Sequence, residues 1–318
     1  MIADMHCDTI YKIRQERQKG RDVHLRDSGE LCVNLKKMQQ GKYLVQNFAI
    51  YINLKEHEDP YENAMELVTL FEQEMEQNKE LIRPVTSYAE ILENQKKGVL
   101  SAMLTLEEGG MCIGEIERLH EFYAHGARMM ALSWNYENEL CYSAAVADGA
   151  SGFGLKKKGF EFLEEMEAIG MIPDVSHLSD EGFFDLLKVC KKPFAASHSN
   201  ARSVCGHRRN LTDEMLHQLG EHGGVAGLNF YPEFLGEELE REACLDALAK
   251  HACHMMQKGG TACVGLGSDF DGFTGDGRPA DAADIDDLVW ALHHAGMTEE
   301  ETEGILYRNV MNFYKEVL

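Results

Sequence analysis

The sequence predicts a single (β/α)8 barrel of the TIM type, and three observations lead to this fold class. Short apolar runs alternate with helix-period segments, these runs number about eight, and no linker rich in Ser, Gly or Pro separates them. Most runs are nearly continuous in apolar character, as in parallel strands covered by helices on both faces. We therefore expect one α/β domain over residues 1–318, with a doubly wound open sheet as the second choice.

The predicted strands follow one another at intervals that leave room for a helix between most pairs. Each is rich in β-branched or aliphatic residues and is followed by a polar or Gly-containing turn. They cover residues 2–6, 43–52, 99–106, 128–134, 171–177, 194–198, 224–230 and 263–269.

Amphipathic segments between these runs are predicted to be helices. Ser179-Asp180 and Thr212-Asp213-Glu214 are start signals, and Gly170, Gly220 and Gly259 are stop signals. From about residue 284 the chain should form two or three further helices, which we expect to close the outer surface of the barrel. The other predicted helices cover residues 64–78, 159–170, 180–190, 212–220 and 240–259.

Charge and cysteine content exclude several classes of function. The chain carries 31 Lys and Arg against 54 Asp and Glu, a net charge of −23 that repels phosphate backbones and anionic lipids. Nucleic acid and membranes are therefore not expected partners, whereas the sequence leaves a homo-oligomer open. The 9 cysteines form no C-x-x-C pair, and no export signal or apolar run of about 18 residues is present. We expect a cytoplasmic protein with reduced thiols.

Residues able to bind metal gather at the carboxyl ends of the predicted strands, the face on which barrel enzymes build their active sites. A single His in such a place is more often an ordinary hydrogen-bonded residue than a ligand. Their joint occurrence at five strand ends instead predicts a metal site. By contrast His217, His222, His251, His254, His293 and His294 fall in or beside helices and are expected to be solvated. The predicted group consists of His6, Asp8, Glu108, His177, His198 and Asp269.

The types of ligand narrow the choice of metal. Three imidazoles and two carboxylates without a thiolate suit zinc, with manganese, iron and cobalt left open, whereas calcium and magnesium prefer oxygen ligands. A catalytic zinc site uses three protein ligands, so five ligands suggest two ions that share a carboxylate. Paired ions can activate a water and polarise a carbonyl together.

Several motifs resemble those of the membrane (renal or microsomal) dipeptidases and their bacterial relatives, zinc peptidases with an amidohydrolase-like barrel. The motifs span nearly the whole chain in the family's order. H-x-D alone is a weak signal, but the run from Asp174 to Asn210 followed by residues 268–272 is highly specific. The matching pieces are residues 4–8, Glu108-Gly109-Gly110, residues 174–180, 197–202, 207–210, 224–231 and 267–272.

The resemblance implies a role for each matching residue. His6 and Asp8 would bind one zinc, His177 and His198 the other, and Glu108 would bridge them while Glu107 points away. Asp269 would handle the proton, and Arg209 would bind the carboxylate of the substrate, a dipeptide whose carboxyl-terminal residue can be of the D form. The alternative for Arg209 is a surface ion pair, and Arg208 stands beside it, which leaves the choice between the two arginines open.

The chain departs from the family at one position. Trp134 stands where many relatives place a His that contacts substrate, and an indole can donate one hydrogen bond but cannot act as an imidazole. Two rival functions stay open beside the binuclear zinc dipeptidase, the first depending on whether Arg209 faces a substrate carboxylate and the second raised only by Trp134. One is another metal-dependent amidohydrolase, acting on a cyclic amide, a lactone or an N-acyl amino acid; the other is a binding protein without turnover.

Overall fold

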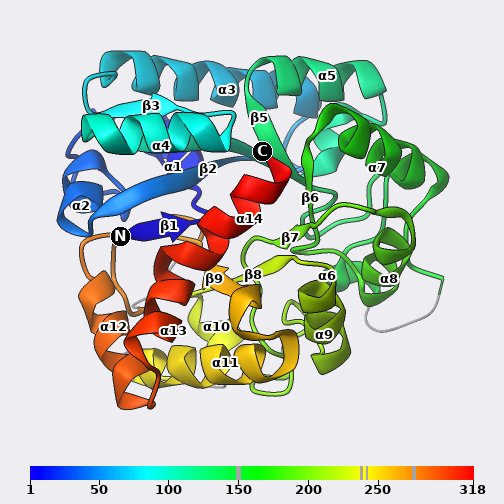
Figure 1. Ribbon diagram of the computed structural model, residues 1–318. Helices are drawn as coiled ribbons and strands as arrows, with labels where there is room; N and C mark the ends of the chain where they lie inside the picture. Colours follow the sequence, from blue (N-terminus) through cyan, green and yellow to red (C-terminus); the bar gives the residue numbers. More distant parts are fainter. Residues whose placement is uncertain (148–151, 237–238, 241–242, 274–276) are drawn as a thin grey trace.

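The computed structural model describes residues 1–147, 152–236, 239–240, 243–273 and 277–318. Its centre is a closed barrel of eight parallel strands surrounded by helices, which confirms the predicted fold class (Figure 1). Each predicted strand is present, and most are shorter than the apolar run that predicts them. The barrel strands are β1 (Ile2–Asp4), β2 (Tyr43–Tyr51), β4 (Leu100–Glu107), β5 (Ala127–Ala131), β6 (Ile172–Asp174), β7 (Ala195–Ala196), β8 (Val225–Leu228) and β9 (Val264–Leu266).

The order of strands around the barrel is β2-β1-β9-β8-β7-β6-β5-β4, and pairing of β2 with β4 closes the ring. In that closing pair Tyr51 lies beside Glu107 at the carboxyl end. A ninth strand, β3 (Ile82–Pro84), pairs with the first residues of β4, whereas β5 begins to pair with β4 only at Leu104. Strand β3 therefore adds to the barrel wall at its amino-terminal end.

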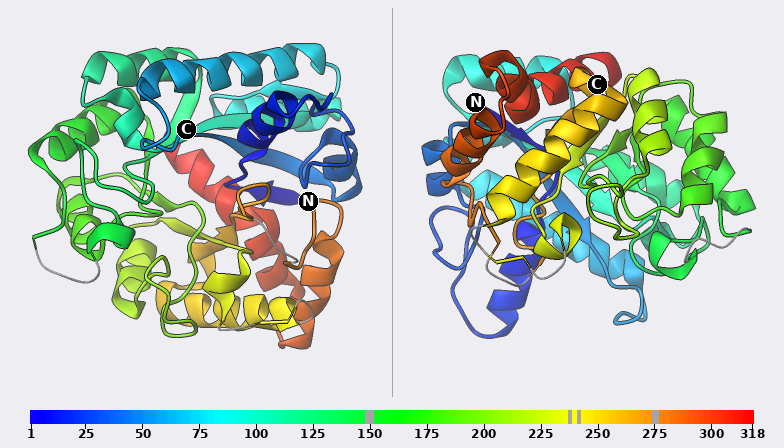
Figure 2. Two further views of the ribbon diagram at one scale, coloured as in Figure 1. Left: turned by 180° about the vertical axis from the view of Figure 1, so that it is seen from behind. Right: turned by 90° about the horizontal axis from the view of Figure 1, so that it is seen from below.

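The helices surround the barrel, and α1 projects on the side opposite α14 (Figure 2). Short 3₁₀ turns cover Gly109–Cys112 and Thr261–Cys263, and a π-helical turn covers Gly304–Arg308. No helix among the described residues is both long and apolar enough to span a bilayer. The helices are α1 (Thr9–Gln18), α2 (Leu35–Gln40), α3 (Pro60–Gln77), α4 (Tyr88–Lys97), α5 (Ile116–Ala124), α6 (Ala144–Ala147), α7 (Lys157–Ile169), α8 (Asp180–Val189), α9 (Asp213–Glu221), α10 (Pro232–Leu235), α11 (Ala243–Gly259), α12 (Ile285–His294), α13 (Glu299–Glu303) and α14 (Asn309–Val317).

Local signals in the sequence set several helix ends. Ser179 and Thr212 accept hydrogen bonds from the backbone of the first turn of α8 and α9, as the start signals predict. Gly170 ends α7 in the left-handed conformation, which glycine adopts without steric cost. Gly220 instead lies within the last turn of α9, and residues 241–242, at the start of the helix predicted over 240–259, lie outside the described part.

The amino-terminal half of the barrel interior is apolar, and α14 closes this end of the barrel. One buried residue or two from every barrel strand except β9, or from the continuation of that strand, form a cluster with four residues of α14. At its centre the Tyr314 hydroxyl donates a 2.9 Å hydrogen bond to Asn47 Oδ1 of β2. Figure 1 shows α14 lying across the middle of the barrel. The expectation that the last helices close the outer surface is therefore wrong for α14, which seals the amino-terminal end.

Candidate active site and metal centre

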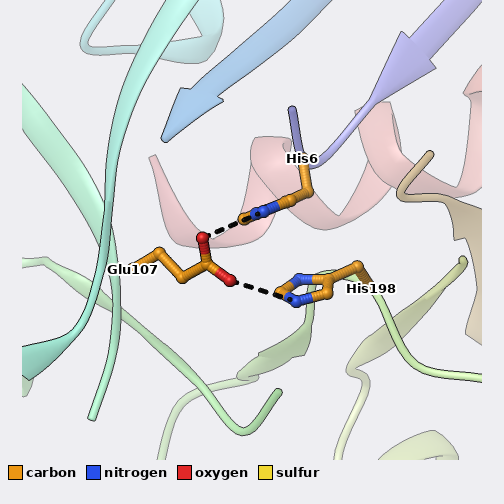
Figure 3. Close-up of side chains that lie close together, drawn as sticks. All are labelled: His6, Glu107 and His198. Atoms are coloured by element: carbon orange, nitrogen blue, oxygen red, sulfur yellow. Dashed lines mark ion pairs between the residues drawn. The ribbon is translucent and has the colours of Figure 1, made fainter. Parts of the chain in front are cut away.

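Three histidines and Glu107 meet at the carboxyl-terminal end of the barrel. Figure 3 shows Glu107 between two of them, His6 and His198. Glu107 is the last residue of β4, and the histidines follow β1, β6 and β7. His177 Nε2 lies 2.9 Å from His198 Nε2, and the His6 and His198 rings stack with their centroids 3.9 Å apart. All four side chains are buried. The ends of the short strands therefore bring four polar groups together in a place with little access to water.

The two oxygens of Glu107 face different histidines. Oε2 lies 3.4 Å from His6 Nε2, whereas Oε1 lies 3.0 Å from His177 Nε2 and 3.5 Å from His198 Nε2. A carboxylate in this position can hold one cation with each oxygen. Its burial, and then the charge of Asp8, raise the pKa of Glu107 well above its usual range.

Two aspartates extend the cluster on the side of His6. Asp8 Oδ2 lies 3.3 Å and Asp269 Oδ1 3.8 Å from His6 Nε2. Asn229 donates a 2.9 Å hydrogen bond to Asp269 Oδ2, and burial raises the pKa of Asp269 to about 7. A Cβ on Gly272 would come within 2.4 Å of either carboxylate, so only glycine fits there.

The chemistry of this donor set fits metal ions. His6 Nε2 and Asp8 Oδ1 are buried without a hydrogen-bond partner, which is costly unless another group satisfies them. Burial, followed by the charges of Arg209 and His6, lowers the pKa of His177 well below its usual value, so its imidazole is neutral and able to bind a cation. Three imidazoles and two carboxylates without a thiolate suit zinc.

The structure reverses the predicted roles of Glu107 and Glu108. Glu108 does not join the histidines: its carboxylate points away and accepts hydrogen bonds from Gly110 N, at 2.7 Å, Trp134 N, at 2.9 Å, and Asn138 Nδ2. Four of the five predicted metal ligands, together with Asp269, do come together. Glu107, rather than Glu108, lies with them.

Strand alternation explains this reversal. Met103 belongs to the interior cluster and Leu104 to the outer core, so every second residue of β4 faces inward and Glu107 shares the face of Met103. The Glu-Gly-Gly pattern led to Glu108, which follows the strand with a positive φ of 152°. The alternation of apolar leucines at 104 and 106 with other residues was the signal that could have identified Glu107.

Two buried aspartates that sequence reasoning did not single out hold the ligand loops. Asp174 accepts hydrogen bonds from Ser197 N, at 2.9 Å, and from the Ser197 hydroxyl, whose oxygen lies 2.7 Å from His198 Nδ1. His198 Nδ1–H then donates to Ser197, which leaves Nε2 free to bind a cation. Asp4 holds Ser268 in the same way, with hydrogen bonds of 2.9 Å from its N–H and 2.6 Å from its hydroxyl.

Arg209 lies in the same cavity, with its guanidinium buried and short of partners. It makes two long hydrogen bonds of 3.4 Å, to Ser199 Oγ and the His198 carbonyl, and its Nε has none. No carboxylate among the described residues forms an ion pair with it, and burial lowers its pKa to about 10. Arg208 is exposed and donates a 3.0 Å hydrogen bond to the Ala145 carbonyl. Arg209 is therefore the arginine that offers free donors to a ligand.

The cavity above the cluster has a volume of about 830 Å³, and aromatic rings line part of it. Tyr11, Tyr51, Trp134 and Tyr136 form a continuous aromatic wall, with centroids of successive rings 4.9, 4.8 and 5.6 Å apart. Trp134 also lies 6.3 Å from the ring of His177. The cavity is large enough for a small ligand to reach the cluster, Arg209 and the wall together.

A (β/α)8 barrel with buried imidazoles and carboxylates at the carboxyl ends of its strands defines a metal-dependent hydrolase. The model of the membrane dipeptidase family, peptidase family M19, matches residues 1–318, so the chain belongs to this family and is a metallo-dipeptidase. An uncharacterized dipeptidase of Schizosaccharomyces pombe is 30% identical over 99% of this chain and 80% of its own length. A dipeptidase of Claviceps purpurea is 26% identical over 99% of this chain and 76% of its own length.

Solved structures share the fold along the whole chain. A metallopeptidase from Rhodobacter sphaeroides, liganded with a phosphinate mimic of the dipeptide L-Ala-D-Ala, superposes with a TM-score of 0.90 at 23% identity and covers 100% of this chain and 99% of its own. A second metallopeptidase of family M19 gives a TM-score of 0.89 at 24% identity, covering 99% of this chain and 98% of its own. Both confirm the barrel architecture.

Proposed function

We propose that this metallo-dipeptidase is a binuclear zinc enzyme that hydrolyses dipeptides with a free carboxyl terminus. The observation that carries the proposal is the position of Glu107, whose two oxygens face His6 on one side and His177 and His198 on the other. His6, Asp8 and Glu107 would hold one ion, and His177, His198 and Glu107 the other. When bound, the ions would activate a water and polarise the scissile carbonyl.

The groups around the metal ligands would bind and orient the substrate. Arg209 presents unused donors in a buried place, so its guanidinium would bind the terminal carboxylate through paired hydrogen bonds. Asp269, held by Asn229, lies beside His6 and faces the cavity. It would accept a proton on its free oxygen and deliver it to the leaving amine.

Elemental analysis tests the number of ions. Protein purified with zinc and freed of excess metal should carry about two zinc ions per chain at full activity. Full activity with one tightly held ion would refute the binuclear proposal.

The substitution Arg209→Met tests the substrate class. If the guanidinium binds the terminal carboxylate, the substitution should lower kcat/KM for a free dipeptide at least about tenfold, because charge-assisted hydrogen bonds contribute on the order of 1.5 to 3 kcal/mol. The amide of the same dipeptide lacks the charge, so its slow hydrolysis should change little. Equal losses on both substrates, with zinc content unchanged, would favour an amidohydrolase of broader specificity.

We also propose that the carboxyl-terminal residue can be of the D form. The phosphinate mimic of L-Ala-D-Ala bound by the Rhodobacter sphaeroides metallopeptidase supports this. Hydrolysis of matched L-L and L-D dipeptides by the zinc-loaded protein would test it, and cleavage of only the L-L series would refute it. The cytoplasmic location stays a prediction, which the absence of a C-x-x-C pair among the 9 cysteines supports.

A further inference from the structure

Glu108 is a fully buried carboxylate for which the proposed chemistry has no use. Its Oε1 accepts hydrogen bonds from Gly110 N and Asn138 Nδ2, and its Oε2 accepts one from Trp134 N. Its positive φ of 152° is a conformation that favours glycine. Three N–H donors directed at one buried carboxylate offset this backbone cost, because a buried acceptor without donors would be costly.

Two of these hydrogen bonds, from Trp134 N and Asn138 Nδ2, hold the segment that follows β5. Asn138 Nδ2 also donates a 2.7 Å hydrogen bond to the Leu132 carbonyl, and Asn138 Oδ1 accepts from Leu140 N and Cys141 N at 2.8 and 3.0 Å. Glu108 and Asn138 therefore fix both ends of the turn that carries Trp134. The position of the indole depends on these buried polar contacts, since the side chain itself is only half-buried.

The held indole completes the aromatic wall beside the metal cluster. Trp134 makes edge-to-face contacts with Tyr51 and Tyr136, at centroid distances of 4.8 and 5.6 Å. Without the indole these two tyrosines would be separated by a gap in the cavity lining. The wall would then lose its largest apolar surface.

The wall lies across the barrel from Arg209. Tyr51 ends β2, Tyr11 follows β1, and Trp134 and Tyr136 follow β5, whereas Arg209 follows β7 and contacts the carbonyl of His198. The wall therefore spans the sector from β1 through β2 and β4 to β5. The middle of this sector, between β2 and β4, lies opposite β7 and β8, because β2 is four strands from β7 and β4 is four strands from β8; β5 is two strands from β7. A dipeptide with its carboxylate at Arg209 and its scissile carbonyl at the cluster would therefore direct its amino-terminal residue toward the wall.

We propose that Trp134 selects dipeptides with a large apolar amino-terminal side chain, and that Glu108 is the positioning residue that holds it. The inference rests on the proposed binding of the substrate carboxylate by Arg209. An apolar pocket distinguishes a substrate whose apolar group fills it from one that lacks this group by roughly 10- to 200-fold in kcat/KM. Phe-Ala should therefore exceed Gly-Ala in kcat/KM by at least about tenfold.

Kinetics of Trp134 variants test the specificity. Trp134→Ala should lower the Phe-Ala to Gly-Ala ratio of kcat/KM about tenfold, chiefly through a higher KM for Phe-Ala, whereas Trp134→Phe should keep most of the ratio. An unchanged ratio in an active Trp134→Ala enzyme would overturn this inference and leave the dipeptidase proposal intact. Failure of the wild type to cleave any dipeptide would instead refute the proposed function.

Fluorescence tests the role of Glu108 independently of activity. The chain has 2 tryptophans, and Trp290 is 61% exposed on α12, so Trp290→Phe leaves Trp134 as the single indole. In this background Glu108→Gln replaces one acceptor oxygen by an amide N–H, which cannot accept a hydrogen bond from the surrounding donors. The turn that carries Trp134 should then be held less firmly, and the Trp134 emission should shift to longer wavelength. The Phe-Ala preference should fall as well, with zinc content unchanged.

Asp271→Asn provides a matched control. Asp271 is also a carboxylate at positive φ, but it accepts hydrogen bonds from Thr9 Oγ1, Cys32 N and Val33 N in another loop. Its substitution should leave the emission and the substrate preference unchanged. If Glu108→Gln does not fold, Asn138→Ala replaces it with the same expected shift. Unchanged emission and preference in a folded Glu108 or Asn138 variant would overturn the role of Glu108.

Discussion

Two adjacent glutamates lie at the end of β4 with their carboxylates buried, and the two carboxylates contact different kinds of group. Glu107 faces three imidazoles, whereas Glu108 faces three N–H donors. Opposite substitution effects should follow from this difference, because an amide at a metal ligand loses the negative charge that two cations share.

Glu107→Gln should therefore lose at least one of the two zinc ions proposed per chain, whereas Glu108→Gln should keep both. Elemental analysis after gel filtration measures the difference, with circular dichroism as the check that both variants fold. Loss of zinc from Glu108→Gln and retention by Glu107→Gln would restore the ligand assignment that the Glu-Gly-Gly pattern predicts.

Asp269 should contribute to turnover without being needed for metal binding. Asp269→Asn keeps the hydrogen bond to Asn229, after rotation of either amide, but cannot take up a proton at neutral pH. Loss of general acid/base work should lower kcat by about 10² to 10⁴. The measurement is kcat on a free dipeptide at matched zinc content. Near-normal turnover would give Asp269 a structural role.

The residue types in the sequence predict where the site lies, but they do not predict which of two adjacent glutamates, Glu107 or Glu108, faces the histidines. His6, Asp8, His177 and His198 were identified because each lies at or just beyond the end of a predicted strand, and a barrel brings strand ends together. The supporting aspartates at 4 and 174 were not identified, since their partners come from other strands far along the chain. His251 was expected to be solvated but is buried, with hydrogen bonds to Ala201 N and the Leu235 carbonyl.

At the scale of helices and strands, local sequence signals predict the helices well. They do not predict strand pairing or helix docking that depends on the rest of the fold. Capped helices such as α8 and α9 carry their own start signals. Strand β3 is short, contains a proline and pairs only with β4, so it has no sequence pattern of its own. The position of α14 at the amino-terminal end of the barrel depends on the closed ring of strands, so it cannot be predicted from the sequence of any single segment.

The α14 helix should be stabilised by the buried hydrogen bond of Tyr314 to β2, which adds to those that Asn309 donates to the Thr261 and Val264 carbonyls. Tyr314→Phe removes the hydroxyl that pairs with Asn47 Oδ1 and leaves that oxygen buried without this donor. The free energy of unfolding should fall by about 1 to 3 kcal/mol. Urea denaturation measures the change, and Asn312→Ala on the exposed side of the same helix should cost much less. Equal effects of the two substitutions would contradict the sealing role of Tyr314.

At the scale of the whole molecule, the net charge of −23 should make stability depend on salt. Like charges repel more in the compact state than in the unfolded chain, and salt screens them. The Debye length falls from about 30 Å at 0.01 M to about 10 Å at 0.1 M ionic strength, so most of the gain in Tm should occur over this range.

Thermal unfolding at pH 7 with NaCl varied between these limits should show Tm rising by a few degrees. The same titration near pH 5.0, where the sequence is isoelectric, serves as the control and should be nearly flat. A flat response at pH 7 would mean that the acidic residues are already compensated locally by ion pairs.

The seal formed by α14 also constrains the order in which the molecule can be completed during synthesis. Residues 309–317 emerge from the ribosome after all eight strands, yet they cover apolar side chains contributed by the strand ends around the ring. A nascent chain with every strand present would still expose the floor of its barrel to water. Until α14 docks, this surface is available for binding by chaperones or for aggregation, so the nascent barrel needs protection longest at the end opposite its catalytic face.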